Sequence, residues 1–474
     1  MRERARNTAL VTALAGALAG MGCTTSSGPP PSEALPIPYP APAPPAPPPP
    51  VSAPAADGGG YEGAEDIVVT GSRVDGASRP RRESRRDRAE AASASTFAPP
   101  GRGGQGRQAG VLTAGDYDDL LNPTFYAGYV SRALQQQGGR RLPYVDTTQR
   151  VTVAVTGRGG RPVPFAHVRV RRPSGPDLDL RTATDGTVVL FPALDRLGDT
   201  SRVTVSVPNG PSLTRPLVVS EGASRLEVVV DAQAAAPHAF DLLMVVDATG
   251  SMTDEMEYLK AEISSIMAGL ADSHPGMDTR IGLIVYRDVG DAYVVREFPF
   301  TGDVQQVRAQ LAEQRADGGG DTPEAVDQAM KRAMAYPWRE DAVKALVLVA
   351  DAPPHDDRIE ATWAEALTAR ERRIHIVPVA ASGVDDSAEF LMRAMAAVTQ
   401  SRYVFLTDDS GVGLPHADPE VKCYQVTRLD GLLRRVLDSL ISGRRVEPSE
   451  REVIRRVGPY REGVCETDRQ RRPQ

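Results

Sequence analysis

The sequence predicts an α/β fold class: a doubly wound, mostly parallel sheet, preceded by a small all-β sandwich and a disordered, proline-rich N-terminal tether. Three observations lead to this prediction. Short β-branched apolar runs alternate with helical patterns in the C-terminal half, valines alternate with polar residues over 148–232, and prolines crowd residues 29–54. A chain of 474 residues is too long for one core, so two or three domains are expected.

Four apolar runs have the length and the β-branched content of strands that are buried on both faces. They are residues 240–246, 280–286, 345–350 and 374–379. Between them lie helical patterns over 253–270 and 323–334, the second with Thr322 as the expected N-cap and Pro323 at the first helical position. A last helix, apolar at helical spacing over 429–440, is expected to pack on one face of the sheet. In such folds, ligands bind at the carboxyl ends of the strands.

Oxygen-bearing side chains stand at those strand ends. Asp247, Thr249 and Ser251 occupy alternate positions after the first run, Asp351 closes the third, and Thr322 follows a glycine run. Hard cations such as Mg²⁺ take about six oxygen ligands and keep some water. Each position alone is ordinary turn or capping chemistry, but the five together predict a cation site with a vacancy for a partner's carboxylate.

Four motifs resemble the von Willebrand factor type A (VWA) domain, most closely the subgroup that includes hemicentin-like extracellular proteins. They are Asp247-Ala-Thr249-Gly-Ser251-Met252, Tyr286-Arg287-Asp288, Gly318-Gly-Gly-Asp321-Thr322-Pro323-Glu324 and Ala350-Asp351-Ala352-Pro353-Pro354-His355. The resemblance covers residues 238–445 and implies a Rossmann-like fold. It also implies a metal-ion-dependent adhesion site formed by Asp247, Thr249, Ser251, Thr322 and Asp351. The implied cofactor is Mg²⁺, or else Mn²⁺ or Ca²⁺, and the implied partner is a protein that supplies an acidic residue.

Residues 148–232 are predicted to form a small sandwich because valines alternate with polar residues between turn signals. The stretch Arg161-Pro-Val-Pro-Phe-Ala-His-Val-Arg-Val170, followed by Thr184-Asp-Gly186, resembles the carboxypeptidase regulatory-like domain, which is a non-catalytic sandwich. Residues 111–147 are predicted to be a short helical segment with a helix over 124–137. Its Asp116, Asp118 and Asp119 are expected in a turn, since the loop lacks the later glycine and glutamate of an EF-hand.

The first residues are predicted to direct export. Residues 1–22 have a basic start and a short apolar stretch, as a signal peptide does, and Cys23 follows them as in a bacterial lipoprotein. Gly20 departs from the lipoprotein pattern, so secretion with a free Cys23 stays open. The protein is predicted to lie in the bacterial cell envelope. It would be an outer-membrane lipoprotein that faces the periplasm and is anchored to the membrane by its lipid. A secreted or surface-exposed protein is the alternative.

The tether over 23–110 is predicted to be disordered, with a polyproline spacer over 29–54. Residues 65–73 resemble the TonB box of outer-membrane receptors. Their Ile67, Val68 and Val69 could add a strand to a TonB-like periplasmic protein.

Composition limits the remaining function classes. A net charge of −7 gives no case for nucleic-acid binding. With three cysteines no disulfide scaffold is implied, although Cys423 and Cys465 could pair and fix the charged tail over 446–474. No HExxH or GxSxG motif is present and the histidines are scattered, so no enzyme is predicted. The alternatives to cation-dependent adhesion are an envelope scaffold with a structural cation and, less favoured, a metal-dependent hydrolase.

Overall fold

The computed structural model describes residues 111–208, 210–232, 235–410, 416 and 419–466. The predictions for the signal peptide, for Cys23 and for Ile67, Val68 and Val69 lie outside these residues. Among the helices that are described, none combines the length and the apolar character needed to cross a membrane.

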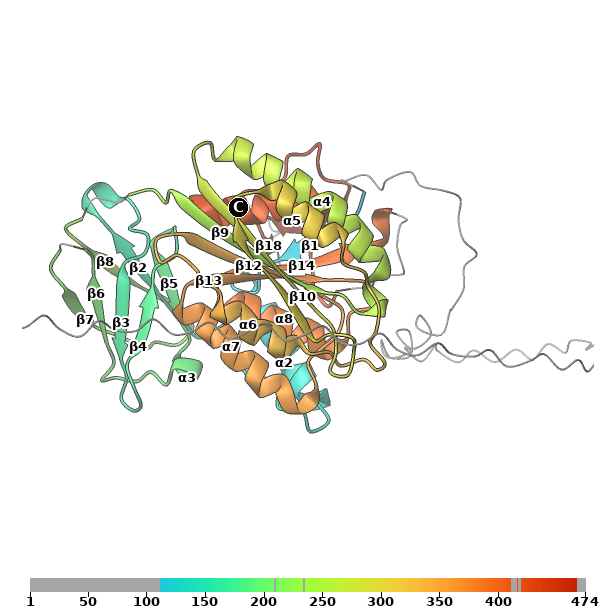
Figure 1. Cartoon of the computed structure of the whole chain (residues 1–474). Coiled ribbons are helices and arrows are strands. Elements are labelled where there is room, and N and C mark those ends of the chain that lie inside the picture. The colour runs from blue at the N-terminus through green and yellow to red at the C-terminus, as the bar shows by residue number, and fades with distance from the viewer. Residues whose placement is uncertain (1–110, 209, 233–234, 411–415, 417–418, 467–474) are drawn as a thin grey trace, which may run out of the picture. The chain divides into compact units, whose positions relative to one another are not determined.

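A nine-stranded sheet organises the C-terminal half, with the strand order β11-β10-β9-β12-β13-β14-β1-β15-β16 (Figure 1). Its strands β10, β9, β12, β13 and β14 run parallel, and the other pairings are antiparallel. The fold class predicted from the sequence is therefore confirmed. The strands are β1 (Thr113–Tyr117), β9 (Ala239–Asp247), β10 (Asp278–Tyr286), β11 (Val295–Thr301), β12 (Val343–Ala350), β13 (Ile374–Ala380), β14 (Tyr403–Thr407), β15 (Tyr424–Arg428) and β16 (Arg455–Val457).

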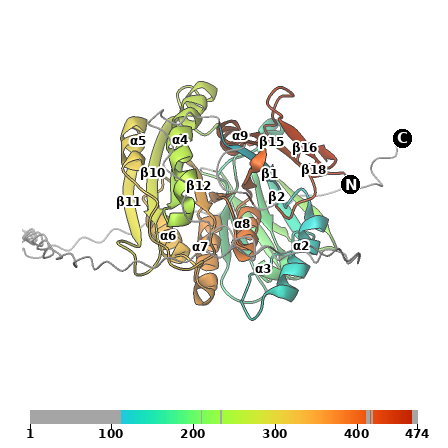
Figure 2. The ribbon, with the colours of Figure 1, turned by 90° about the vertical axis from the view of Figure 1, so that its right-hand side faces the viewer.

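Helices cover both faces of this sheet. In Figures 1 and 2, α4 and α5 lie on one side and α6, α7 and α8 on the other, and Figure 2 shows α9 on the side of α4. The side chains of β9 alternate between the two cores, because successive residues of a strand point to opposite faces. The helices are α4 (Thr253–Ser273), α5 (Val304–Ala312), α6 (Val326–Ala335), α7 (Ile359–Glu371), α8 (Asp386–Val398) and α9 (Leu429–Ser442).

The segment 111–147 is part of the same domain, and it is not only helical as the sequence suggested. Strand β1 lies between β14 and β15, so Asp116 belongs to a strand and not to the expected turn. Helix α2 (Pro123–Gln136) follows, close to its predicted bounds. Arg393 of α8 is fully buried, pairs with Asp119 through contacts of 2.7 and 3.0 Å, and lies 3.9 Å from the ring centre of Tyr129.

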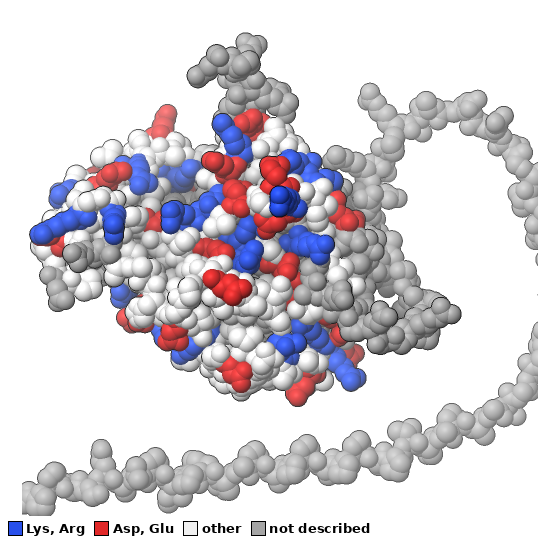
Figure 3. All heavy atoms as spheres, turned by 90° about the horizontal axis from the view of Figure 1, so that it is seen from above, with Lys and Arg blue, Asp and Glu red and all other residues white. Residues whose placement is uncertain are grey.

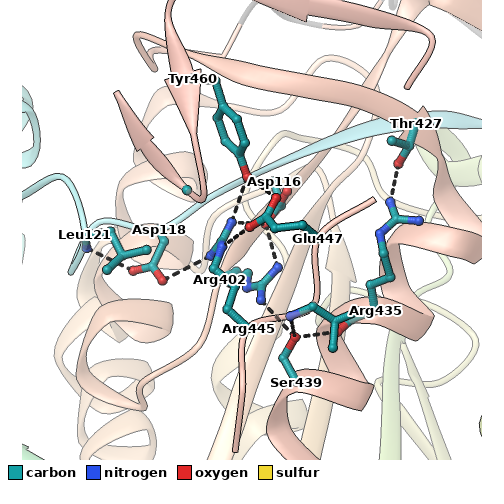
Figure 4. Close-up of polar contacts among 12 residues, drawn as sticks. Asp116, Asp118, Leu121, Arg402, Thr427, Arg435, Ser439, Arg445, Glu447 and Tyr460 are labelled. Carbon is teal, nitrogen blue, oxygen red and sulfur yellow. Dashed lines mark hydrogen bonds and ion pairs between the residues drawn. The ribbon is translucent and has the colours of Figure 1, made fainter. Parts of the chain in front are cut away.

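The charged tail is folded as far as residue 466. Asp116 accepts hydrogen bonds from Arg402 at 3.1 Å and from Arg445, just before this tail, at 3.3 Å (Figure 4). A disulfide bond joins Cys423 and Cys465, whose Cα atoms are 5.5 Å apart. The tail also contains the hairpin β17 (Tyr460–Arg461) and β18 (Val464–Cys465).

Residues 150–229 form two facing sheets, as the alternating valines predicted. Sheet β5-β2-β8 packs against sheet β4-β3-β6-β7 over a valine-rich core. Arg370 of α7 binds Asp195 through two contacts of 2.7 and 2.8 Å and so ties this sandwich to the large sheet domain. The elements are β2 (Arg150–Thr156), β3 (His167–Arg171), β4 (Leu178–Arg181), β5 (Thr187–Leu190), α3 (Pro192–Asp195), β6 (Arg202–Ser206), β7 (Leu213–Pro216) and β8 (Ala223–Val229).

Candidate metal site

Two predicted ligands lie at the carboxyl ends of neighbouring parallel strands. Asp247 is the last residue of β9, and Asp351 follows the last residue of β12. The register pairs Val349 of β12 with Val246 of β9, so the two aspartates leave the sheet at the same edge. Asp247 is fully buried and Asp351 nearly so.

The loop after β9 holds three predicted ligands in one chain of hydrogen bonds. The Thr249 amide and hydroxyl donate to Oδ1 of Asp247 at 2.9 and 2.7 Å, and the hydroxyls of Thr249 and Ser251 are 3.3 Å apart. Thr249 is buried, whereas Ser251 is exposed. A hydrogen bond from Ser251 also acts on the carboxylate of Asp351. Four of the five predicted ligands are therefore linked to one another.

The glycine run 318–320 packs closely against this loop. The Gly250 amide donates to the carbonyl of Gly318 at 3.0 Å. Gly319 has a φ of +70°, and a Cβ there would lie 3.2 Å from Cβ of Thr249 and 2.8 Å from Oε1 of Glu324. A side chain would not fit, so close packing explains this glycine.

Thr322, the fifth predicted ligand, lies on an exposed loop. It is not the N-cap of a helix as the sequence suggested, because α6 begins at Val326 and is capped by Ala325. The Glu324 amide instead donates to the carbonyl of Pro353 at 2.9 Å, which pairs the loop with the segment that follows Asp351. Thr322 thus lies between a contact with the first ligand loop and a contact with the second. Within the described residues its hydroxyl has no hydrogen-bond partner in the protein.

Negative charge is crowded at this edge. Burial raises the pKa of Asp247 to about 6, and burial together with the charge of Asp247 raises the pKa of Asp351 to about 8. Glu324 is buried as well, and its pKa rises to about 10 through burial and the neighbouring charges of Asp247 and Asp288. Removal from water and like-charge repulsion both oppose ionisation, and a bound cation would relieve the repulsion.

Unpartnered oxygens provide a test of whether a cation fits. Oδ2 of Asp247, Oδ1 of Asp351 and Oε2 of Glu324 are buried and have no hydrogen-bond partner of normal geometry in the described part of the chain. The Tyr286 hydroxyl also acts on the carboxylate of Asp247 and lowers its pKa, against the larger effect of burial. Buried polar atoms are normally paired, so each of these oxygens requires an explanation. The residues present fit a divalent cation, which would satisfy such oxygens.

The donor set combines two carboxylates with three hydroxyls. No group of three or more His, Cys, Asp or Glu side chains is placed to hold an ion among the described residues, and the predicted set is not of that kind. Glu324 was not predicted from the sequence to belong to the metal site. The available signal was an acidic residue two positions after Thr322.

His355, which ends the fourth motif, has a structural partner. His355 contacts the carboxylate of Asp288 at 2.8 Å, and this hydrogen bond raises the pKa of the imidazole. His355 therefore fixes the loop that follows Asp351 to the loop after β10.

Residues 241–417 match the sequence model of the von Willebrand factor type A domain. The fold and this match define the C-terminal half of the chain as a VWA domain, a kind of domain that commonly mediates protein–protein adhesion and is mostly non-enzymatic.

Two curated relatives match part of this chain. The alpha-protein kinase vwkA of Dictyostelium discoideum is 33% identical over 121 residues, 25% of this chain and 19% of the relative. The putative ariadne-like RING finger protein R811 of Acanthamoeba polyphaga mimivirus is 33% identical over 118 residues, 24% of this chain and 11% of the relative. The chain thus spans less than a fifth of the length of either relative.

Solved structures with a similar arrangement have low overall similarity. The conserved hypothetical protein BatB from Bacteroides thetaiotaomicron has a TM-score of 0.29 at 12% identity, over 42% of this chain and 98% of its own. The pilus adhesin SpaC from Lactobacillus rhamnosus GG has a TM-score of 0.33 at 13% identity, over 51% and 32% respectively. The SpRpn10 VWA domain has a TM-score of 0.27 at 12% identity, over 33% and 82%.

Proposed function

We propose that this protein is a cell-envelope adhesion module that captures a partner protein through a divalent cation. The observation that carries the proposal is the pair of buried, unpartnered carboxylate oxygens on Asp247 and Asp351, at the edge where two parallel strands end. Leaving such oxygens unpaired is costly, and a cation would compensate them.

Each residue would have a distinct role around the cation. Asp247 and Asp351 would supply the negative charge. Thr249 is oriented by its two hydrogen bonds to Asp247, which direct its hydroxyl oxygen toward the same region. Ser251 and Thr322 would add hydroxyl oxygens from the exposed side. The cation, Mg²⁺ or else Mn²⁺ or Ca²⁺, would supply a positive centre that attracts an Asp or Glu of the partner.

The envelope location rests on the sequence of the N-terminal region and on one structural feature. The Cys423–Cys465 disulfide is typical of proteins that fold in an oxidising compartment such as the periplasm. Export with lipidation at Cys23 would hold the module at the outer membrane. The strand Ile67–Val68–Val69 would offer a second contact, to a TonB-like protein, and the sandwich would act as a non-catalytic, carboxypeptidase regulatory-like domain.

Chemical cross-linking in envelope fractions tests the proposal. The full chain, its Thr322→Ala variant and the control variant Thr200→Ala would be compared with and without EDTA. Thr200 is an exposed threonine in a loop of the sandwich, so Thr200→Ala should leave partner capture unchanged. We expect partner capture by the native chain and the control, lost on chelation and in Thr322→Ala. Capture that survives both EDTA and Thr322→Ala would refute cation-dependent binding.

A further inference from the structure

The loops around the proposed cation site carry many more acidic than basic side chains. Contacts join these loops: Arg287 lies 3.6 Å from Asp317, the Gly319 amide donates to Asp291 at 3.0 Å, and His355 contacts Asp288. We call the acidic residues of these loops, other than the two proposed ligands and the buried Glu324, the acidic rim. It consists of Asp288, Asp291, Asp317, Asp321, Asp356 and Asp357. The arginines of the same loops are Arg287, Arg315 and Arg358, and Arg140 pairs with Asp356 at 2.8 Å.

Three rim carboxylates face solvent with little compensation. The side chains of Asp317 and Asp357 are 81% and 74% exposed, and their arginine contacts of 3.6 and 3.4 Å are at the long end of the ion-pair range. Exposed pairs of this kind contribute about 0–1 kcal/mol. Asp321, next to Thr322, is exposed and has no salt bridge among the described residues. The acidic rim therefore has a net negative charge, which produces a negative electrostatic potential at this edge of the sheet.

This potential reaches the proposed cation site. The Gly319 amide donates to Asp291 at 3.0 Å, and the preceding Gly318 carbonyl accepts at 3.0 Å from the amide of Gly250, which stands between the proposed ligands Thr249 and Ser251. The unpartnered oxygen of Glu324 lies within the same region, and Glu324 is only 3% exposed. On the face drawn in Figure 3, basic and acidic side chains are interspersed.

A partner carboxylate that approaches the cation must pass these acidic side chains. Like charges brought together at an interface are unfavourable, and complementary charges raise the rate of association. An isolated acidic residue, or one within an acidic segment, would be repelled by the rim before it reached the cation. A carboxylate flanked by basic residues would instead be attracted by the rim and bound by the cation.

We infer that the partner is a protein segment whose metal-binding Asp or Glu lies between lysine or arginine residues, which pair with the acidic rim. This inference rests on the proposed function and specifies the partner of the same site. The cation would select the carboxylate, and the rim would select its neighbours. The two contributions differ in salt dependence, because exposed charges are screened by salt while the contact with the cation is short.

The test selects random short peptides displayed on phage against the immobilised, Mg²⁺-loaded full chain, with elution by EDTA so that only cation-dependent binders are recovered. The variant Asp317→Asn/Asp321→Asn/Asp357→Asn neutralises the rim at exposed positions, where folding should be unaffected. The control Asp177→Asn/Asp199→Asn/Glu221→Gln removes the same amount of charge from exposed positions of the sandwich. Peptides recovered on the native chain would then be measured against all three proteins at low salt and at about 1 M NaCl, where the Debye length is about 3 Å.

We expect the recovered peptides to carry an acidic residue next to Lys or Arg. Their association rate should fall by about tenfold on the rim variant and at high salt, and should stay unchanged on the control. EDTA-eluted peptides without enriched Lys or Arg, or an association rate that the rim variant leaves unchanged, would overturn the inference and leave the proposed function standing. Failure to recover more EDTA-eluted peptides on the native chain than on Thr322→Ala would refute the proposed function, and the inference with it.

Discussion

Replacing Arg393 with methionine tests whether the segment before the sandwich belongs to the VWA domain. Arg393 on α8 is fully buried, pairs with Asp119 through two hydrogen bonds and packs over Tyr129 of α2. Asp119 is only 3% exposed, so Arg393→Met would leave a buried carboxylate without its cation. Breaking a buried pair in this way costs about 3–5 kcal/mol.

The expected loss can be measured by urea denaturation followed by circular dichroism. With a denaturant slope of about 2 kcal/mol per molar, a loss of about 4 kcal/mol lowers the unfolding midpoint by about 2 M. The second variant, Arg393→Met/Asp119→Leu, should recover part of this loss, because Asp119 is then no longer a buried carboxylate without its cation. The recovery should be incomplete, because the buried Glu389 still loses its 3.4 Å contact with Arg393.

Arg132 provides a matched control. It lies on α2 and pairs with Glu420 at 2.6 Å, but its side chain is 49% exposed, so Arg132→Met should cost less than about 1 kcal/mol. An Arg393→Met midpoint equal to that of Arg132→Met would refute the reasoning, since the N-terminal segment would then add nothing to the stability of the domain.

Three further predictions concern stability. Removing the Cys423–Cys465 bond, which closes a loop of 42 residues, should lower the free energy of unfolding by about 4 kcal/mol; denaturation of Cys423→Ser/Cys465→Ser would show this, and an unchanged midpoint would contradict it. Burial acts to raise the pKa of Asp116, but Arg402 and Arg445 outweigh it and hold that pKa below its usual value. The charged form is therefore favoured in the folded state, so the stability lost in Asp116→Asn should be full at neutral pH and should shrink as the pH falls below about 4; a pH-independent difference would argue against this. Gly319→Ala should cost more than about 1 kcal/mol because of its positive φ and the contact with Glu324, whereas Gly320→Ala, where a Cβ meets nothing within 4 Å, should be tolerated; equal melting temperatures would contradict the packing argument.

The sequence predicted the parallel strands well because their signal is local. Strands β9, β10, β12 and β13 consist mainly of β-branched and apolar residues, most of them buried, and their observed bounds differ from the predicted ones by two residues or fewer. Helix α9 was found for a similar reason, since its apolar residues recur at helical spacing.

Strand β1 was missed because its stability comes from distant residues. Its sequence Thr-Ala-Gly-Asp-Tyr has little strand character by itself. A Cβ on Gly115 would lie 2.7 Å from the ring of Phe405 and 2.9 Å from that of Tyr424, so the glycine allows both aromatic rings to pack on the strand. Neither contact can be read from the local pattern.

The five candidate ligands come from the sequence and stay a prediction, whereas the contacts that surround them could not be read from the sequence. Thr322 was expected to begin a helix because Pro323 follows it, yet the bond between the Glu324 amide and the Pro353 carbonyl keeps that backbone in a loop. The same long-range pairing brings Glu324 into the site, which residue spacing alone does not show. The metal itself stays a prediction from the sequence, supported by the unpartnered oxygens of Asp247 and Asp351.

Isothermal titration of Mg²⁺ into the metal-free full chain tests the central claim most directly. The account predicts saturable uptake at one site, and an affinity at least about tenfold weaker in Thr322→Ala, with Thr200→Ala unchanged. Saturation to about 100 times the dissociation constant should also stabilise the native chain by about 2.7 kcal/mol. A folded native chain that takes up no Mg²⁺, Mn²⁺ or Ca²⁺, or a Thr322→Ala chain that binds as tightly as the native one, would contradict it.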